Sequence, residues 1–123
     1  MRTHMYFPYS TIRSELAGAT INSVELYLLN VHTWYNAGGT AAIAMHNYAS
    51  PQTTFGTSTA VKNEHFAKGE GKWVSLSGAV GTGFQNGTVK GISLNPGINY
   101  NLDYYGYYGW AYGKPTLRIK YTK

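Results

Sequence analysis

The residues with the most distinctive chemistry gather near the carboxyl end, in the stretch from Asn99 to Gly113. This stretch reads NYNLDYYGYYGWAYG and holds six of the chain's twelve tyrosines, one of its three tryptophans and its only aspartate. A flat Tyr or Trp ring covers the apolar C–H face of a sugar at little cost in entropy, and Tyr adds a hydroxyl group at the wet edge. The stretch therefore predicts recognition of a carbohydrate through aromatic side chains.

The candidate ligand-binding residues come from two loops, the tyrosine-rich loop and a loop that follows a strong strand. They are Tyr105, Tyr107, Tyr108, Trp110 and Tyr112 in the first loop, and Trp34 and Tyr35 in the second. Two other roles stay open for the same rings. They could pack as a structural lid over the fold, or they could contact another subunit, where tyrosine is common.

Catalysis is not predicted. Glycoside hydrolysis needs two carboxyl groups that flank one bond, one as acid and one as base or nucleophile. The chain's five carboxylates form no recognisable pair, and they are Glu15, Glu25, Glu64, Glu70 and Asp103. No nucleophile-elbow motif is present to indicate a Ser–His–acid triad. We therefore expect no enzyme activity and no cofactor.

A metal site is not predicted either. The chain has no cysteine, and its histidines lack the spacing of metal ligands. These histidines are His4, His32, His46 and His65. His32 and His46 lie on consecutive expected strands, where they could meet by chance. Asn99, Asn101 and Asp103 would share one strand face and could offer oxygens to calcium, but one carboxylate is too few for a tight site.

The chain carries a net charge of +5, but its ten basic residues are dispersed. No basic run indicates a nucleic-acid arm, and no glycine loop is followed by a helix and a lysine to bind phosphate. The charge is typical of a basic surface, or of weak attraction to an anionic polymer such as a bacterial cell-wall phosphate polymer. No apolar run approaches the roughly 20 residues of a membrane span, so membrane insertion is not expected.

The elements that must position these residues read as short strands. Alternating apolar residues, clearest in Val24, Leu26 and Leu28, favour strands over 3–7, 23–32, 41–46, 60–66, 72–76, 89–94, 100–104 and 117–121. Turn signals recur every eight to twelve residues. This pattern predicts an all-β fold, an antiparallel and jelly-roll-like sandwich of about eight or nine short strands.

Several local features are predicted more finely. Residues 8–18 hold the only expected helix, capped by Ser10 or Thr11 and ended by Gly18. Residues 77–86 are glycine-rich and are expected to form a short turn. The strands over 60–66 and 72–76 flank a turn that is typical of a hairpin. Trp73 lies on a strand and is expected in the core.

A single domain is expected over residues 1–123. The sequence alternates like a strand from its first residues, and this pattern indicates the C-terminal module of a longer chain.

Three segments resemble a known family. LAGATINSVELYL over 16–28, KWVSL over 72–76 with NGTVKGISL over 86–94, and KPTLRIKY over 114–121 are similar to the shared pattern of DNRLRE-type or carbohydrate-binding-like β-sandwich modules. Val24 departs from the small residue usual there, and the Tyr-Gly stretch is more aromatic than the family's loop. The resemblance implies a β-sandwich, and it carries over no named binding residue.

Such modules stand in secreted bacterial surface proteins and in phage tail or fibre proteins. The expectation is a non-enzymatic adhesion or receptor-binding module of a phage tail or fibre, which binds a cell-surface glycan or cell-wall polymer through aromatic loops. A homo-oligomer such as a trimer in the virion is expected, with the bacterial cell surface or the extracellular space as the alternative location. Two other functions stay open: a structural assembly domain of a tail or capsid with no free ligand, and the non-catalytic module of a secreted enzyme.

Overall fold

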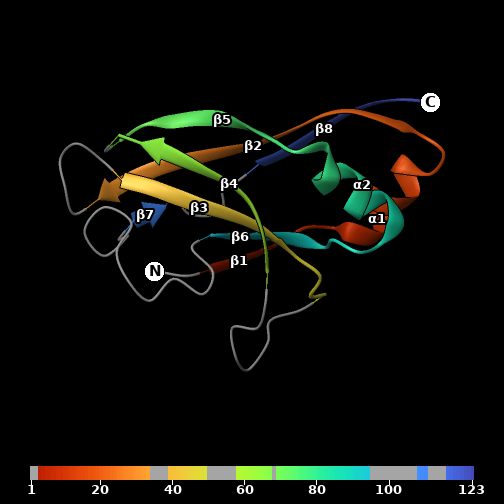
Figure 1. Cartoon of the computed structure of the whole chain (residues 1–123), viewed down its shortest axis with the longest axis horizontal. Coiled ribbons are helices and arrows are strands. Elements are labelled where there is room, and N and C mark those ends of the chain that lie inside the picture. The colour runs from red at the N-terminus through yellow and green to blue at the C-terminus, as the bar shows by residue number, and fades with distance from the viewer. Residues whose placement is uncertain (1–2, 34–38, 50–57, 68, 95–107, 111–115) are drawn as a thin grey trace.

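The computed structural model describes residues 3–33, 39–49, 58–67, 69–94, 108–110 and 116–123. Its strands form two sheets that face each other, and two short helices lie together at one end (Figure 1). The strands are β1 (Thr3–Tyr6), β2 (Thr20–Thr33), β3 (Gly39–His46), β4 (Thr59–Phe66), β5 (Gly71–Leu76), β6 (Gly91–Leu94), β7 (Tyr108–Trp110) and β8 (Thr116–Thr122). The helices are α1 (Tyr9–Leu16) and α2 (Gly78–Asn86).

Every pairing between these strands is antiparallel. Sheet one has the order β1-β6-β3-β4. Sheet two is built on β2, which β5 and β8 flank on opposite sides because both pair with the same part of it, while β7 pairs with its carboxyl end. The predicted antiparallel sandwich is confirmed, with eight strands in the part of the chain that the structure describes.

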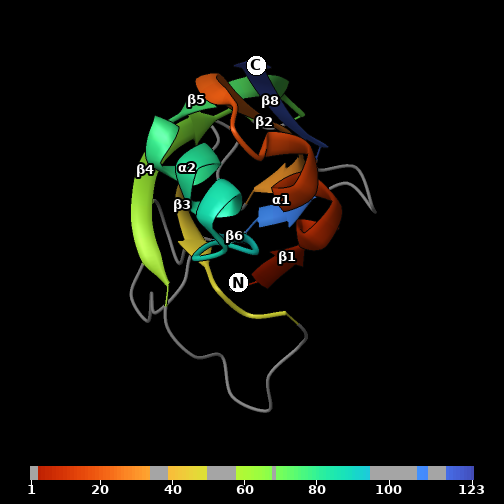
Figure 2. The same ribbon diagram turned by 90° about the vertical axis from the view of Figure 1, so that its right-hand side faces the viewer.

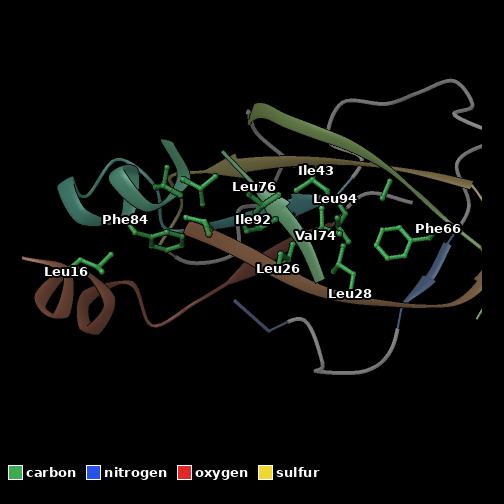
Figure 3. Close-up of a cluster of buried hydrophobic side chains, with 14 residues drawn as sticks. Leu16, Leu26, Leu28, Ile43, Phe66, Val74, Leu76, Phe84, Ile92 and Leu94 are labelled. Carbon is green, nitrogen blue, oxygen red and sulfur yellow. The ribbon is translucent and has the colours of Figure 1, made fainter. Parts of the chain in front are cut away.

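The core lies between the two sheets. The predicted alternation of β2 is confirmed, because Val24, Leu26 and Leu28 are at most 1% exposed. They meet side chains from sheet one such as Ile43 and Ile92 (Figure 3). Since successive side chains of a strand point to opposite faces, the buried residues also fix which side chains point out to solvent.

A second helix corrects the expectation of a turn over 77–86. Helix α2 starts after Ser77, whose Oγ accepts a hydrogen bond from the Ala79 amide at 3.2 Å, and it ends at Gly87 with φ of 84°. Its glycines allow close packing: a Cβ at Gly81 would lie 2.7 Å from Ile21. The helix therefore forms because it packs on the sandwich, in spite of the low helix propensity of glycine.

Helix α1 is longer than one turn, and its predicted cap is wrong. Pro8 is the N-cap, and no side chain caps the helix, so neither Ser10 nor Thr11 does. Gly18 follows the last turn with φ of 75°, as the sequence predicted for the end. The two helices pack against each other at the end of the sandwich (Figure 2), where Gln85 of α2 donates to the Leu16 carbonyl at 2.7 Å.

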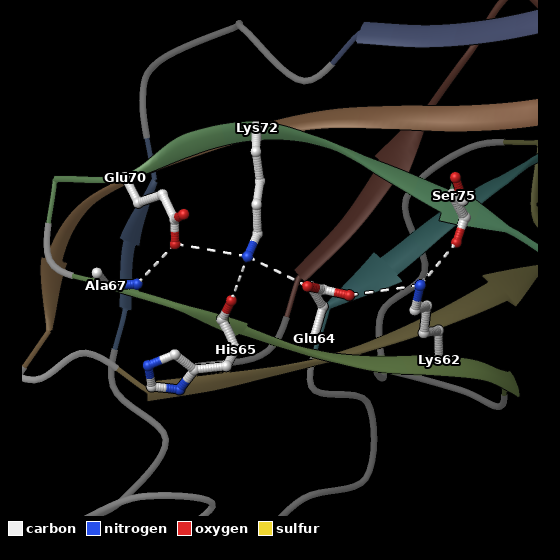
Figure 4. A network of polar contacts seen from close by, with 7 residues as sticks. All are labelled: Lys62, Glu64, His65, Ala67, Glu70, Lys72 and Ser75. Carbon is white, nitrogen blue, oxygen red and sulfur yellow. Dashed lines mark hydrogen bonds and ion pairs between the residues drawn. The ribbon is translucent and has the colours of Figure 1, made fainter.

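Strands β4 and β5 follow each other but do not form a hairpin ladder, which corrects the expected pairing. β4 is the edge of sheet one and β5 belongs to sheet two. Side chains join the two edges instead: Lys72 of β5 lies 3.1 Å from Glu64 and donates to the His65 carbonyl at 2.6 Å, and Lys62 of β4 donates to the Ser75 carbonyl at 3.2 Å (Figure 4). We call this the lysine edge.

Candidate functional site

The outer face of sheet two carries the most distinctive side chains that the structure describes. In the strand register Tyr27 lies between Trp73 of β5 and Thr116 of β8, and Glu25 lies between Ser75 and Arg118. All of these positions are out of phase with the buried residues of their strands, so they face outward. Two rows of side chains therefore stand next to each other across the three strands.

Trp73 is exposed, which corrects its expected place in the core. The residue is 39% exposed, because Val74 and Leu76 take the inward positions of β5. Its ring meets Tyr27 edge to face, with ring centroids 5.5 Å apart and planes at 65°. Such pairs add about 1 kcal/mol beyond the area they bury. The indole is thus fixed in place by a cross-strand neighbour while much of it remains open to solvent.

Arg118 connects the two rows. Its guanidinium carbon lies 4.0 Å from the centroid of the Trp73 ring, and its Nε donates to Oε1 of Glu25 at 3.0 Å. This hydrogen bond from Arg118 holds the pKa of Glu25 below its ordinary value of 4.5, so the carboxylate is ionised at neutral pH. We call Trp73, Tyr27, Arg118 and Glu25 together the aromatic face.

The aromatic face combines an apolar ring with charged hydrogen-bonding groups. A flat ring offers an apolar surface, and a charged donor and a charged acceptor beside it can hydrogen-bond a polar ligand at their free lone pairs and N–H groups. Glu25 pairs with Arg118, and the neighbouring Ser75 lies opposite Glu25 in the register.

Two of the sequence-predicted site residues lie in described strand backbone. Tyr108 pairs with Thr33 and Trp110 with Asn30, so β7 adjoins β2 three residues beyond Tyr27 of the aromatic face. The other predicted residues lie outside the described part of the chain, and they are Trp34, Tyr35, Tyr105, Tyr107 and Tyr112. The calcium candidates Asn99, Asn101 and Asp103 lie outside it as well.

His46 has a structural setting. Its Nε2 donates to the Met5 carbonyl at 2.8 Å, and its Nδ1 accepts from the Tyr48 amide at 3.1 Å, which fixes the neutral tautomer with the proton on Nε2. Gly91 lies between β1 and β3 at this row and leaves room for the imidazole. His32 lies on β2 and His46 on β3, and these two strands belong to different sheets.

Beyond these contacts, the described residues and the comparisons with known proteins give few further indications of function. Among the described residues no group of three or more His, Asp or Glu side chains comes together to hold a metal ion. No described helix is long and apolar enough to cross a membrane. No protein-family model matches this chain, and no curated protein matches it significantly.

Sequence reasoning missed Tyr27, Glu25 and Arg118 as a group, because strand register brings them together and one sequence does not give register. The sequence did contain a signal that Trp73 faces outward. It stands between Lys72 and Val74, out of phase with the apolar positions Val74 and Leu76, and that phase places it on the outer face.

Proposed function

We propose that this chain is a non-enzymatic adhesion or receptor-binding module that binds cell-surface carbohydrate. The observation that carries the proposal is the exposed indole of Trp73, held by Tyr27 and Arg118 on an open sheet face. Sugars are bound by aromatic rings that cover their C–H faces, with planar charged groups at the rim for their hydroxyl groups. Arg118 and Glu25 supply such a rim.

The binding surface extends toward the tyrosine-rich loop in this proposal. Strand β7 pairs with residues 30–33 of β2, next to the aromatic face, so the predicted ligand residues Tyr108 and Trp110 lie on a strand of the same sheet. The resemblance to DNRLRE-type modules supports the setting, a phage tail or fibre or a bacterial cell surface. The ligand is then a glycan or polymer of the cell wall.

The test is binding of the 123-residue chain to a glycan array and to purified bacterial cell-wall fractions. Trp73→Ala should weaken binding at least about tenfold, which corresponds to the loss of one good stacking contact. Tyr6→Ala is the matched control, because Tyr6 is a similarly exposed aromatic residue, at 37%, on sheet one. Equal binding by wild type and Trp73→Ala, or no binding to any fraction, would reject the proposal.

A structural assembly domain is the second candidate, and a groove of about 460 Å³ between α1 and β8 favours it. Its walls are mostly apolar and include Phe7, Ile12, Leu117 and Ile119. Assembly of copies through this groove would give an oligomer, which analytical ultracentrifugation measures directly. A stable oligomer without any glycan binding would replace the first proposal by this one.

A further inference from the structure

A second hollow lies at the helical end of the molecule. It has a volume of about 240 Å³, and α1, the end of α2 and the segment between α2 and β6 form its walls. Tyr9, Ser10, Arg13 and Ser14 come from α1, and Lys90 comes from the segment before β6. Ser10, Arg13 and Ser14 lie three and four residues apart, so they share one face of the helix. The fold thus brings two cations and two hydroxyl groups to one small hollow.

Neither cation is neutralised within the described part of the chain. Lys90 donates to neutral oxygens, Oδ1 of Asn47 at 2.5 Å and the Gly87 carbonyl at 3.3 Å, and its Nζ lies 5.6 Å from the centroid of the Tyr9 ring. The side chain of Arg13 makes no hydrogen bond or ion pair with any described residue.

The acidic side chains of the described residues make their contacts away from this hollow. Glu25 pairs with Arg118, Glu64 and Glu70 lie at the lysine edge, and Glu15 accepts a hydrogen bond from Tyr121. Two positive charges on one small hollow attract an anion, and the described residues supply none.

The backbone of the hollow is shaped for the arginine. Gly87 has φ of 84°, and a Cβ there would lie 2.8 Å from Nη1 and 3.0 Å from Cζ of Arg13. The guanidinium group therefore rests directly against the Gly87 backbone. Arg13 and Lys90 therefore both lie beside Gly87, so cationic donors reach the hollow from α1 and from the segment before β6.

We propose that this hollow binds a compact tetrahedral oxyanion, a phosphate or sulfate group. Arg13 and Lys90 supply the charge, and the hydroxyl groups of Ser10 and Ser14 are additional donors. An anion with three or four oxygens can accept from several sides at once, whereas a carboxylate offers two oxygens in one plane. The site does not depend on the aromatic face or on the function proposed for it.

The test is an NMR titration of the ¹⁵N-labelled chain at pH 7, with sodium phosphate against sodium chloride at equal ionic strength. Phosphate should shift the amide signals of Gly87, Thr88 and Lys90 in a saturable way, and chloride should not. Arg13→Gln should weaken the phosphate affinity at least about tenfold, because one charge-assisted contact is lost. Lys123→Gln removes the same charge far from the hollow along the chain and should leave the affinity unchanged.

The outcomes separate a site from general attraction. Arg13→Gln is the informative variant, because no described hydrogen bond of the fold depends on Arg13, and its folding is checked from the rest of the same spectrum. Equal shifts with chloride, equal weakening by Lys123→Gln, or wild-type affinity in Arg13→Gln would overturn the proposal. Acetate bound as tightly as phosphate would also overturn it.

Two further probes identify the source of the anion. Methyl phosphate stands for a terminal phosphate group, and dimethyl phosphate stands for a phosphodiester chain such as a wall polymer. Arg13-dependent binding of either one supports the site. Tighter binding of dimethyl phosphate assigns it to a polymer backbone, and tighter binding of methyl phosphate assigns it to a chain end or a free phosphate.

Discussion

The outer faces of the two sheets differ in what they leave open to solvent. In sheet one three outward positions of the central strands are buried: Ser93 is 0% exposed, Ala44 is 1% and His46 is 3%. In sheet two the outward Trp73 is 39% exposed and is surrounded by charged and aromatic neighbours. Sheet one therefore acts as the scaffold of the sandwich on both of its faces, while sheet two presents one face that a ligand can reach.

The row Tyr6–Gly91–His46 shows how sheet one is closed. The Tyr6 ring meets the His46 ring edge to face at 5.1 Å, Tyr48 stacks on the other side at 5.9 Å, and the imidazole reaches the Met5 carbonyl across Gly91. A polar side chain that is buried with both ring nitrogens satisfied is a packing element. The difference between the outer faces of the two sheets leads to four predictions.

The largest effect is expected at Gly91. A Cβ there would lie 2.0 Å from the Met5 carbonyl oxygen and 2.3 Å from Nε2 of His46, so Gly91→Ala should lower the free energy of unfolding by about 3 kcal/mol in urea denaturation. Gly78→Ala is the matched control, because its Cβ meets nothing within 4 Å. That change should stabilise α2 by about 0.5 kcal/mol. A Gly91→Ala protein as stable as wild type would show that sheet one is not closed here.

His46→Ala is expected to lower the free energy of unfolding by about 2 kcal/mol, since it leaves the Met5 carbonyl and the Tyr48 amide without this partner. Thermal and urea unfolding measure the change. His65→Ala, which removes an exposed ring, should change the free energy of unfolding by no more than about 0.5 kcal/mol. If both substitutions cost the same, the buried setting of His46 contributes nothing.

Trp73→Ala should lower the free energy of unfolding by only about 1 kcal/mol, although it removes a large side chain. The lost contacts are the edge-to-face pair with Tyr27 and the stacking of Arg118. Leu26→Ala on the buried side of the same sheet should cost about 3 kcal/mol in the same urea assay. A Trp73→Ala protein destabilised as strongly as Leu26→Ala would show that the outer face of sheet two is part of the core.

The smallest effect concerns Glu25. Because its folded pKa is held below 4.5, the interaction with Arg118 stabilises the fold fully above about pH 4.5 and is lost as the pH falls through the folded pKa. Arg118→Gln should raise the pKa of Glu25 toward 4.5, and NMR titration of the carboxyl carbon measures it. Lys62→Gln, on the other sheet, should leave this pKa unchanged. An unchanged Glu25 pKa in Arg118→Gln would show that Arg118 does not lower the pKa of Glu25.

Much of the scaffold was predictable from the sequence, because apolar alternation reports burial directly. Val24, Leu26 and Leu28 defined β2, and Leu117 and Ile119 do pack against the core as β8 was expected to place them. Helix α2 was missed because glycine disfavours helices, and the burial of Val80, Gly81 and Phe84 in the packed fold explains why the segment is helical.

The candidate site was less predictable. Sequence pointed to Trp110 and its neighbours, whereas the aromatic face gathers side chains from β2, β5 and β8 through register. The hollow of Arg13 and Lys90 joins residues 77 positions apart in number through the packing of α1 on α2. Composition reports that cations are present, but only the fold shows which of them lack a carboxylate partner among the described residues.

The lysine edge has a consequence for the behaviour of the protein at high concentration. The outer rim of a sheet offers unpaired backbone groups, onto which a strand of another molecule can add and start aggregation. Lys62 and Lys72 occupy the carbonyl oxygens of Ser75 and His65, so the same side chains that join β4 to β5 also take acceptors that an incoming strand would need. This edge of the sandwich therefore offers fewer free acceptors to an incoming strand.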